Sequence, residues 1–276
     1  MAGITLADVE SKYSRGEPLT MLTAYDAPMA GLVAESGVDM ILVGDSAGHN
    51  HHGYEDTIPL TTEEALSNTA AVTRGADRPL VVGDLPFNAY GPDVDRSVRT
   101  AGRFLKEACA DAVKLETAPG GTTTVDIVGE CTELGIPVMG HVGLTPQRAN
   151  EMGGTKIQGR AGPESEFADE LVETAGRLAD AGVFALVVEG TTEAVARRIT
   201  EAVDVPTLGI GAGRYTDGQV LVTNDVIGLD PSGYKLAKQY ADVGTVIEDA
   251  TTAFVEDVEA GEFPTREHAY EPMDDE

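Results

Sequence analysis

Met40-Ile41-Leu42-Val43-Gly44-Asp45-Ser46 is the stretch around which the chain is organised, and Leu80-Val81-Val82-Gly83-Asp84-Leu85-Pro86 repeats its pattern. Each stretch is a short apolar run that stops at Gly-Asp, which is typical of a buried parallel strand. Two later runs, Ala112-Val113-Lys114-Leu115-Glu116 and Phe184-Ala185-Leu186-Val187-Val188-Glu189, also end at a carboxylate. Four strands that each bring an acid to one rim indicate a site that combines a metal with a base.

Strand and helix patterns alternate along the whole chain. We expect strands at a segment that ends at Asp45 and at 19–24, 79–83, 112–115, 136–140, 184–188, 205–210 and 219–222. Apolar periodicity and capping signals predict helices at 4–13, 26–36, 61–73, 93–110, 124–134, 163–181, 193–203 and 235–260. Thr61 and Glu64 have the spacing of a capping box, and Pro163 is expected in the first turn of its helix.

Eight strand–helix units in this length predict an α/β fold, a single (β/α)₈ TIM barrel with a short N-terminal helix and C-terminal helices. A doubly wound parallel sheet is the competing arrangement. We favour the barrel because polar residues follow strands two to six in turn, and a closed barrel brings those strand ends to one mouth. Barrel enzymes keep their chemistry at this C-terminal face.

The length of 276 residues and the lack of a Pro/Ser-rich linker predict one domain over 1–276, with an acidic, polar tail at about 262–276. No apolar run approaches the ~18 residues of a membrane-spanning helix, and the N-terminus lacks a signal-peptide pattern. Cys109 and Cys131 lie in expected helices without a partner motif. We therefore expect buried, reduced thiols in a cytoplasmic protein.

The chain carries 47 acidic and 19 basic residues, a net charge of −28. This charge argues against a nucleic-acid partner and against an anionic membrane surface. An acidic surface for a protein partner is one interpretation. We favour a surface adapted to high salt, where screening weakens the mutual repulsion of the acids, and we hypothesise a halophilic cytosol.

Asp45, Asp84 and Glu116 are three oxygen ligands at the ends of neighbouring expected strands. A sparse set of carboxylates suits Mg²⁺, which keeps several waters and accepts a chelating substrate. The plainer alternative is that each acid caps a helix or lies solvated in a loop. Three acids on adjacent strand ends favour the metal site.

Lys114 and Glu189 complete the expected polar rim. Lys114 stands two residues before Glu116, so both side chains point to the same side of the strand. A lysine inside an apolar strand needs a partner, and either a structural ion pair or a substrate carboxylate would supply one. Glu189 ends a strand distant from the expected metal ligands, where it could act as a general base or lie as a loop acid.

Ser46 and His141 are two further candidates at strand ends. Ser46 could hydrogen-bond a bound anion through its hydroxyl or its N–H. His141 could position the substrate or donate to an oxyanion, although a lone histidine after a strand is more often structural.

Two other motifs are ambiguous. His49, His51 and His52 match no common zinc spacing, and a solvated loop is the better interpretation. Gly209-Ile210-Gly211-Ala212-Gly213 could receive a phosphate at the barrel mouth or form a tight turn that makes room for substrate.

Taken in order, several blocks of this sequence resemble ketopantoate hydroxymethyltransferases, and the resemblance runs through nearly the whole chain. The blocks are Thr23-Ala24-Tyr25-Asp26, Val43-Gly44-Asp45-Ser46, Asp84-Leu85-Pro86-Phe87, Val113-Lys114-Leu115-Glu116, Gly140-His141-Val142-Gly143-Leu144-Thr145-Pro146-Gln147, Gln158-Gly159-Arg160, Glu189-Gly190, Gly209-Ile210-Gly211-Ala212-Gly213 and Asp217-Gly218-Gln219-Val220. Their order and spacing make the resemblance specific.

The resemblance implies a barrel enzyme of pantothenate and coenzyme A biosynthesis, typically a homodecamer. Such an enzyme transfers a one-carbon unit from 5,10-methylenetetrahydrofolate, or a related methylene-pterin, to 3-methyl-2-oxobutanoate. By position, it implies Asp45, Asp84 and Glu116 as Mg²⁺ ligands. Ser46 and Lys114, with the two aspartates, would surround the keto acid, and Glu189 would be the proton acceptor.

Two other classes of protein remain as alternatives. The first is another Mg²⁺- and 2-oxo-acid-dependent barrel, of the isocitrate lyase and phosphoenolpyruvate mutase type, which shares the enolate chemistry. A Lys-Lys-Cys-Gly-His-type motif of isocitrate lyases is absent from the sequence. The second is a non-catalytic acidic barrel that binds a metabolite, against which the aligned acids and Lys114 argue.

Overall fold

The computed structural model describes residues 3–154, 156–229 and 237–270. Contacts divide the chain into two compact units, with the boundary after Thr223, and each unit is described by itself. The single domain over 1–276 stays a prediction. Of the expected acidic tail at about 262–276, residues 271–276 lie outside the described residues.

The first unit is a closed barrel of eight parallel strands, in which each strand pairs with the next along the chain and β8 pairs with β1. The strands are β1 Leu19–Thr23, β2 Met40–Val43, β3 Leu80–Asp84, β4 Ala112–Glu116, β5 Val138–Gly143, β6 Ala185–Glu189, β7 Thr207–Ile210 and β8 Gly218–Leu221. The predicted α/β fold with a (β/α)₈ barrel is confirmed.

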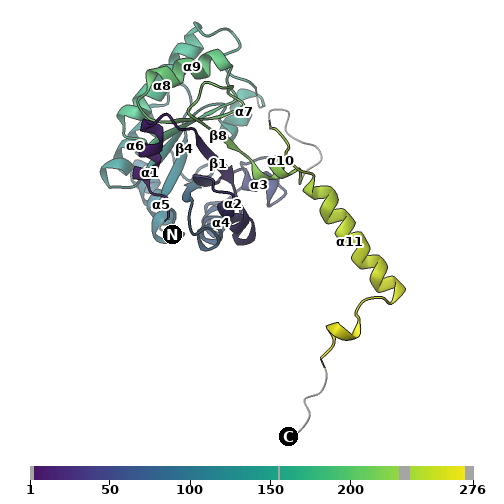
Figure 1. Cartoon of the computed structure of the whole chain (residues 1–276). Helices are drawn as coiled ribbons and strands as arrows, with labels where there is room; N and C mark the ends of the chain where they lie inside the picture. The colour runs from purple at the N-terminus through teal and green to yellow at the C-terminus, as the bar shows by residue number, and fades with distance from the viewer. Residues whose placement is uncertain (1–2, 155, 230–236, 271–276) are drawn as a thin grey trace. The chain divides into compact units, whose positions relative to one another are not determined.

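Helices follow the strands and surround the barrel (Figure 1). The helices of this unit are α1 Leu6–Ser14, α2 Ala27–Glu35, α3 Ala47–Asn50, α4 Thr62–Gly75, α5 Val94–Lys106, α6 Thr122–Glu133, α7 Ala149–Met152, α8 Glu166–Asp180 and α9 Glu193–Ala202, with a 3₁₀ turn, η1, at Pro146–Arg148. Apolar side chains between the strands and these helices form the outer core.

The interior of the barrel has its own apolar core in its N-terminal half. Alternate residues of a strand point inward, so the apolar members of this core recur with a period of two. Met40 and Leu42 of β2 and Leu80 and Val82 of β3 belong to it, and Val9 of α1 joins them. Inward positions farther along the strands are therefore the ones that reach the mouth.

Helix starts follow side-chain capping where the sequence predicts it. The hydroxyl of Thr61 accepts from the N–H of Glu64 at 3.2 Å, and the carboxylate of Glu64 accepts from the N–H of Thr61 at 2.8 Å. This reciprocal pair is the predicted capping box of α4. Asp26 likewise caps α2 by accepting from the N–H of Met29.

Three local predictions are wrong. Pro163 does not open α8; the helix begins at Glu166, because the hydroxyl of Ser165 accepts from the N–H of Ala168 and caps it. The helices predicted from the sequence leave 47–59 and 145–162 without one, but the structure has α3 in the first segment and η1 and α7 in the second.

Cys109 also differs from prediction, whereas Cys131 is buried as expected. The helix predicted to reach residue 110 ends at Lys106. Cys109 follows in the left-handed region with a φ of 57°, and its side chain is exposed. The thiol therefore lies outside the helical packing that the sequence pattern suggested.

The second unit contains most of α10, Thr223–Ile227, followed by α11 Val243–Ala260 and a 3₁₀ turn, η2, at Arg266–His268. The helix predicted at 235–260 begins later, at Val243, where the carboxylate of Asp242 caps it. Residues 235 and 236 of that prediction lie outside the described residues. In the part of the chain that the structure describes, no helix is both long and apolar enough to cross a membrane.

Candidate active site

The mouth of the barrel holds a cavity of about 110 Å³. Seven of its lining residues are those singled out from the sequence: Asp45, Ser46, Asp84, Lys114, Glu116, His141 and Glu189. They come from five consecutive strands, β2 to β6, or from the residues directly after them. The structure thus brings all seven together.

Strand alternation explains why these side chains meet. In β3, β4 and β6 the inward side chains change from apolar to polar toward the mouth. The inward series are Leu80, Val82 and Asp84; Ala112, Lys114 and Glu116; and Ala185, Val187 and Glu189. In β5, Met139 is followed by His141 in the same way. The chemistry therefore lies directly above the apolar core of the barrel.

Asp45 and Ser46 enter the site from the turn after β2. The N–H of Asp45 donates to Oδ2 of Asp84 at 3.0 Å, which ties this turn to β3. Gly44 leaves room for the side chain of Ser46, because a Cβ at position 44 would lie 2.8 Å from the hydroxyl oxygen of Ser46. That hydroxyl forms a hydrogen bond of 2.9 Å with the hydroxyl of Tyr25.

Lys114 lies at the centre of the polar side chains and is 3% exposed. Its Nζ is 3.0 Å from Oδ2 of Asp84 and 3.2 Å from Nδ1 of His141. Burial lowers the pKa of Lys114, but Asp84, Glu116 and Asp45 together raise it above its ordinary value. Lys114 is therefore a permanent cation among these acids.

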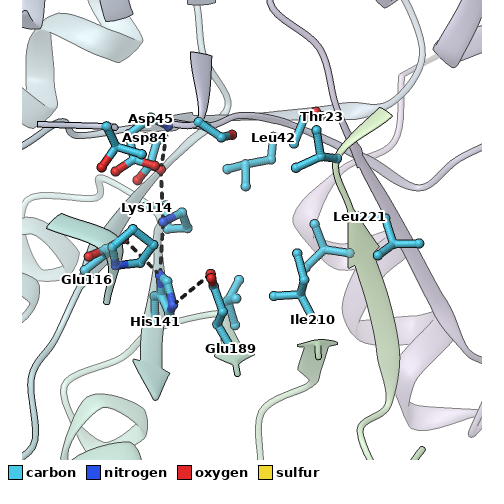
Figure 2. A pocket seen from close by; sticks show the side chains of 17 residues that line it. Thr23, Leu42, Asp45, Asp84, Lys114, Glu116, His141, Glu189, Ile210 and Leu221 are labelled. Carbon is cyan, nitrogen blue, oxygen red and sulfur yellow. Dashed lines mark hydrogen bonds and ion pairs between the residues drawn. The ribbon is translucent and has the colours of Figure 1, made fainter. Parts of the chain in front are cut away.

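His141 is neutral and links Lys114 to Glu189. Burial and the neighbouring Lys114 hold the pKa of His141 well below its ordinary value. Because the ammonium of Lys114 donates to Nδ1, the imidazole proton is on Nε2. That Nε2 lies 3.5 Å from Oε2 of Glu189 (Figure 2). His141 thus presents an N–H toward the carboxyl group of Glu189.

Glu189 ends β6, and 22% of its side chain is exposed. Burial raises the pKa of Glu189 to about 8, with Lys114 opposing the shift and Asp45 and Asp84 adding to it. Gly143 lets the end of β5 approach the end of β6 closely, because a Cβ at position 143 would clash with the carbonyl oxygen of Glu189. A carboxyl group with a pKa near neutrality is suited to moving protons.

Asp84 and Glu116 each keep one oxygen without a hydrogen bond. Within the described part of the chain, Oδ1 of Asp84 and Oε1 of Glu116 are buried and have no hydrogen-bond partner. Burial raises the pKa of both groups, and Lys114 opposes the shift. Buried carboxylate oxygens without partners fit a hard divalent cation that also keeps water or substrate ligands.

The three predicted metal ligands do not form a closed cage. Among the residues that the structure describes, no three His, Cys, Asp or Glu side chains are grouped so that they could hold a metal ion by themselves. Asp45, Asp84 and Glu116 nevertheless line the same cavity. An open set of this kind suits Mg²⁺, which keeps several waters, completes its octahedron with substrate and so needs no closed cage of protein ligands.

The opposite side of the cavity is apolar. Figure 2 shows Leu42, Ile210 and Leu221 facing Lys114, His141 and Glu189 across the open space. We call the two sides the polar wall and the apolar wall. The polar wall consists of Asp45, Ser46, Asp84, Lys114, Glu116, His141 and Glu189. The apolar wall consists of Leu42, Ile210, Val220, Leu221 and Val222.

From the sequence we did not predict that the apolar wall, Tyr90 and Gln147 belong to the site. The apolar wall resembles any strand end in sequence, so its pattern carries no signal. Gln147 accepts from the hydroxyl of Tyr90 and donates to Asp45. The position of Gln147 shortly after His141 at the end of β5 could have indicated that it lies at the mouth.

The two ambiguous motifs contribute little to the cavity. Of the segment 209–213, Ile210 lines it. His49 and His51 are exposed and His52 is half-buried, and none of the three lines the cavity. The ring of His52 stacks on that of Tyr54, with centroids 5.7 Å apart.

Comparisons with known proteins agree with the resemblance seen in the sequence. A family model described as ketopantoate hydroxymethyltransferase matches residues 3–266. A Halobacterium salinarum protein named 3-methyl-2-oxobutanoate hydroxymethyltransferase is 48% identical over 254 residues, which cover 92% of this chain and 90% of that protein. A Thermotoga neapolitana protein of the same name is 46% identical over 255 residues, 92% of each chain.

Solved structures with a similar fold include 2,3-dimethylmalate lyase, a member of the PEP mutase/isocitrate lyase superfamily, with a TM-score of 0.61 at 14% identity. A phosphonopyruvate hydrolase in complex with oxalate and Mg²⁺ has a TM-score of 0.61 at 12% identity. Each match covers 98% of this chain and 92% of the other. At these identities the likeness concerns the fold alone.

Proposed function

This chain belongs to the ketopantoate hydroxymethyltransferase family, and we propose that it makes 2-dehydropantoate from 3-methyl-2-oxobutanoate, 5,10-methylenetetrahydrofolate and water, releasing tetrahydrofolate. The observation that carries the proposal is the two-sided cavity. One wall joins a carboxyl base, a buried cation and unpartnered carboxylate oxygens, and the other wall is apolar. A branched 2-oxo acid needs both.

The cavity matches the substrate in size and polarity. A volume of about 110 Å³ suits a small metabolite better than a large ligand. Lys114 offers a buried positive charge for the carboxylate of the keto acid, and the hydroxyl and N–H of Ser46 are available to its oxygens. The apolar wall, with Leu42 and Ile210, would receive the branched alkyl group.

Asp45, Asp84 and Glu116 are the residues that would hold Mg²⁺. Their support is the pair of unpartnered buried oxygens on Asp84 and Glu116 and the placement of all three acids on one cavity. When bound, Mg²⁺ supplies Lewis-acid stabilisation of the negative charge that develops on the substrate oxygens.

Glu189 is the proposed general base. Its carboxylate takes the proton from C3 of the keto acid, and C3 then forms the new bond to the methylene carbon from the folate. The carbon–nitrogen bonds of that methylene group break, and water supplies the oxygen of the new hydroxymethyl group. The N–H of His141 would steady the ionised Glu189, and Lys114 would offset the charge of the substrate carboxylate.

Proton NMR of 3-methyl-2-oxobutanoate in D₂O tests this proposal. We expect the C3 proton signal to disappear with enzyme, Mg²⁺ and high KCl, with or without tetrahydrofolate. A chelator should abolish the exchange, and so should Glu189→Ala, which leaves Mg²⁺-dependent keto-acid binding intact. Glu173→Ala, on the exposed face of α8, is the matched control. Folded enzyme that exchanges no proton under either condition would contradict this substrate.

A lyase or mutase acting on a related 2-oxo acid is the second candidate. The observation in its favour is the fold likeness to 2,3-dimethylmalate lyase. It would use the same polar wall but no folate donor. Formation of 2-dehydropantoate from 5,10-methylenetetrahydrofolate would decide against it, and against a non-catalytic metabolite-binding barrel as well.

The pterin carrier, assembly and location stay predictions. We propose 5,10-methylenetetrahydrofolate as donor, and a methanopterin-type carrier would be detected by supplying it instead. A homodecamer, as in the resemblance, would appear in light scattering after size-exclusion chromatography. From the two cysteines without a partner motif we expect a cytoplasmic protein, and from the charge of −28 we expect no nucleic-acid or membrane partner.

The halophilic hypothesis is tested by salt. Exposed acids repel one another more strongly as salt is removed, so we expect secondary structure and activity to fall at low KCl. Circular dichroism and the NMR assay across a KCl series measure both. Full structure and activity at low salt would end the hypothesis.

A further inference from the structure

We propose that Gln147 is a positioning residue that fixes the carboxylates of Asp45 and Glu116 and thereby selects the oxygens that face a divalent cation. Tyr90 is its hydrogen-bond partner at the oxygen end of the amide. This inference rests on the proposed function, because it assigns a task at the same site. Neither Gln147 nor Tyr90 belongs to the polar wall.

Gln147 bridges three elements of the barrel mouth. It lies in η1, after β5, and is 5% exposed. Its Nε2 donates to Oδ2 of Asp45 at 3.0 Å and to the carbonyl oxygen of Leu85 at 3.0 Å. Its backbone N–H donates to Oε2 of Glu116 at 3.2 Å. One residue therefore holds two of the three acids proposed for Mg²⁺.

Tyr90 contacts the oxygen end of the Gln147 amide. The hydroxyl of Tyr90 lies 3.0 Å from Oε1 of Gln147 and 3.1 Å from the carbonyl oxygen of Glu116, to either of which it donates. The N–H of Glu116 donates to the same hydroxyl oxygen at 3.1 Å. Because Nε2 donates to Oδ2 of Asp45 and to the carbonyl oxygen of Leu85, a flipped amide would place Oε1 against these two oxygens, which the network disfavours.

These contacts leave one oxygen of Glu116 without a partner. Oε2 of Glu116 accepts from Gln147, whereas the buried Oε1 has no hydrogen bond, and His141 Nδ1 lies 3.6 Å from it. In Asp45, Oδ2 is held by the Gln147 amide. A carboxylate fixed through one oxygen cannot rotate freely, so the other oxygen keeps its direction. Outer partners of this kind orient metal ligands.

The first test measures Mg²⁺ binding by isothermal titration calorimetry, without any turnover. Gln147→Met keeps most of the side-chain volume but removes the amide, and we expect about 10- to 100-fold weaker Mg²⁺ binding. Tyr90→Phe removes one oxygen and leaves the Nε2 contacts in place, so a smaller weakening is expected. Gln219→Met is the control, because the Gln219 amide bonds Thr216 and Gly213 but no acid.

The second test separates positioning from damage to the fold. At increasing Mg²⁺, Gln147→Met should regain C3 proton exchange, because Glu189 and Lys114 are unchanged. A circular dichroism melt shows whether each variant is folded. Unchanged Mg²⁺ affinity in folded Gln147→Met, or exchange that high Mg²⁺ does not restore, would overturn the inference.

The two hypotheses fail in different ways. If wild-type enzyme exchanges the C3 proton with Mg²⁺ and folded Gln147→Met binds Mg²⁺ equally well, the proposed function stands and the role of Gln147 falls. If wild-type enzyme exchanges no proton and binds no Mg²⁺ with the keto acid present, the proposed function falls, and the role of Gln147 falls with it.

Discussion

The polar and apolar walls of the cavity differ in how their side chains are held, although the same barrel builds both. The polar wall is a chain of contacts from Asp84 through Lys114 and His141 to Glu189 (Figure 2). In addition to the effects of burial, Asp84 raises the pKa of Lys114, Lys114 lowers the pKa of His141, and Nε2 of His141 lies 3.5 Å from Oε2 of Glu189. The apolar wall consists of side chains that make no such contacts, and Leu42 and Val220 extend the interior core of the barrel.

This contrast indicates which wall stabilises the fold and which wall carries the proposed chemistry. Burial of apolar side chains stabilises the fold by roughly 25 cal/mol for each Å² removed from water. Burial of charges costs free energy unless the charges are paired, and here four acids share one lysine in the cavity. The cost of burying these charges supports our assignment of the polar wall to function, whereas the apolar wall stabilises the barrel and can also shape the proposed substrate site.

The largest expected effect comes from Glu189, the proposed general base in the polar wall. Glu189 is protonated below its pKa of about 8 and ionised above it, so kcat/KM for C3 exchange should rise about tenfold per pH unit up to pH ~8 and then level off. Glu189→Gln should lower the exchange rate by about 10²- to 10⁴-fold and remove this rise. NMR exchange rates between pH 6 and 10 measure both. A rise that persists in the variant would assign the base elsewhere.

The next effect tests the cation that holds the polar wall together. Lys114→Met leaves the keto-acid carboxylate without its buried partner, and we expect binding to weaken by about 100-fold or more. Calorimetric titration with 3-methyl-2-oxobutanoate at saturating Mg²⁺ measures this. Lys12→Met is the matched control, because Lys12 pairs with Asp39 at the other end of the barrel. Equal loss in both variants would point to damage of the fold.

A smaller effect is expected on the apolar wall. Ile210→Ala removes alkyl groups that would contact the branched end of the substrate, so preference for 3-methyl-2-oxobutanoate over 2-oxobutanoate should fall by about tenfold. The ratio of the two exchange rates is the measurement. Ile199→Ala, in the outer core, should lower the melting temperature without changing that ratio. An unchanged ratio in Ile210→Ala would place the alkyl group elsewhere.

The smallest effect is expected from Tyr25, which bonds the hydroxyl of Ser46. Tyr25→Phe removes one hydrogen bond, worth about 1 kcal/mol, so KM for the keto acid should rise about fivefold with little change in kcat. Steady-state kinetics separate the two constants. A fall in kcat alone would show that Ser46 acts during the chemical step.

Local signals in the sequence predicted most of the barrel. The Thr61–Glu64 capping box begins its helix as expected, because a cap depends only on residues within one turn. The apolar runs before Asp45, Asp84, Glu116 and Glu189 are strands, because burial on both faces requires such runs. The start of α8 was misplaced because Pro163 and Ser165 are both acceptable starts, and the hydroxyl hydrogen bond of Ser165 decides between them.

From the sequence alone we could predict the strand order and the acids at the strand ends, and we could recognise a resemblance specific enough to imply a substrate. Four features could be identified only in the folded barrel: the apolar wall, the bridge made by Gln147 and Tyr90, the proton on Nε2 of His141, and the raised pKa of Glu189. The position of a residue along a strand determines which face of the sheet its side chain takes, and this can be derived from the local sequence. Contacts between β2, β4 and the turn after β5 join residues as far apart as Asp45 and Gln147, and they exist only once the barrel closes.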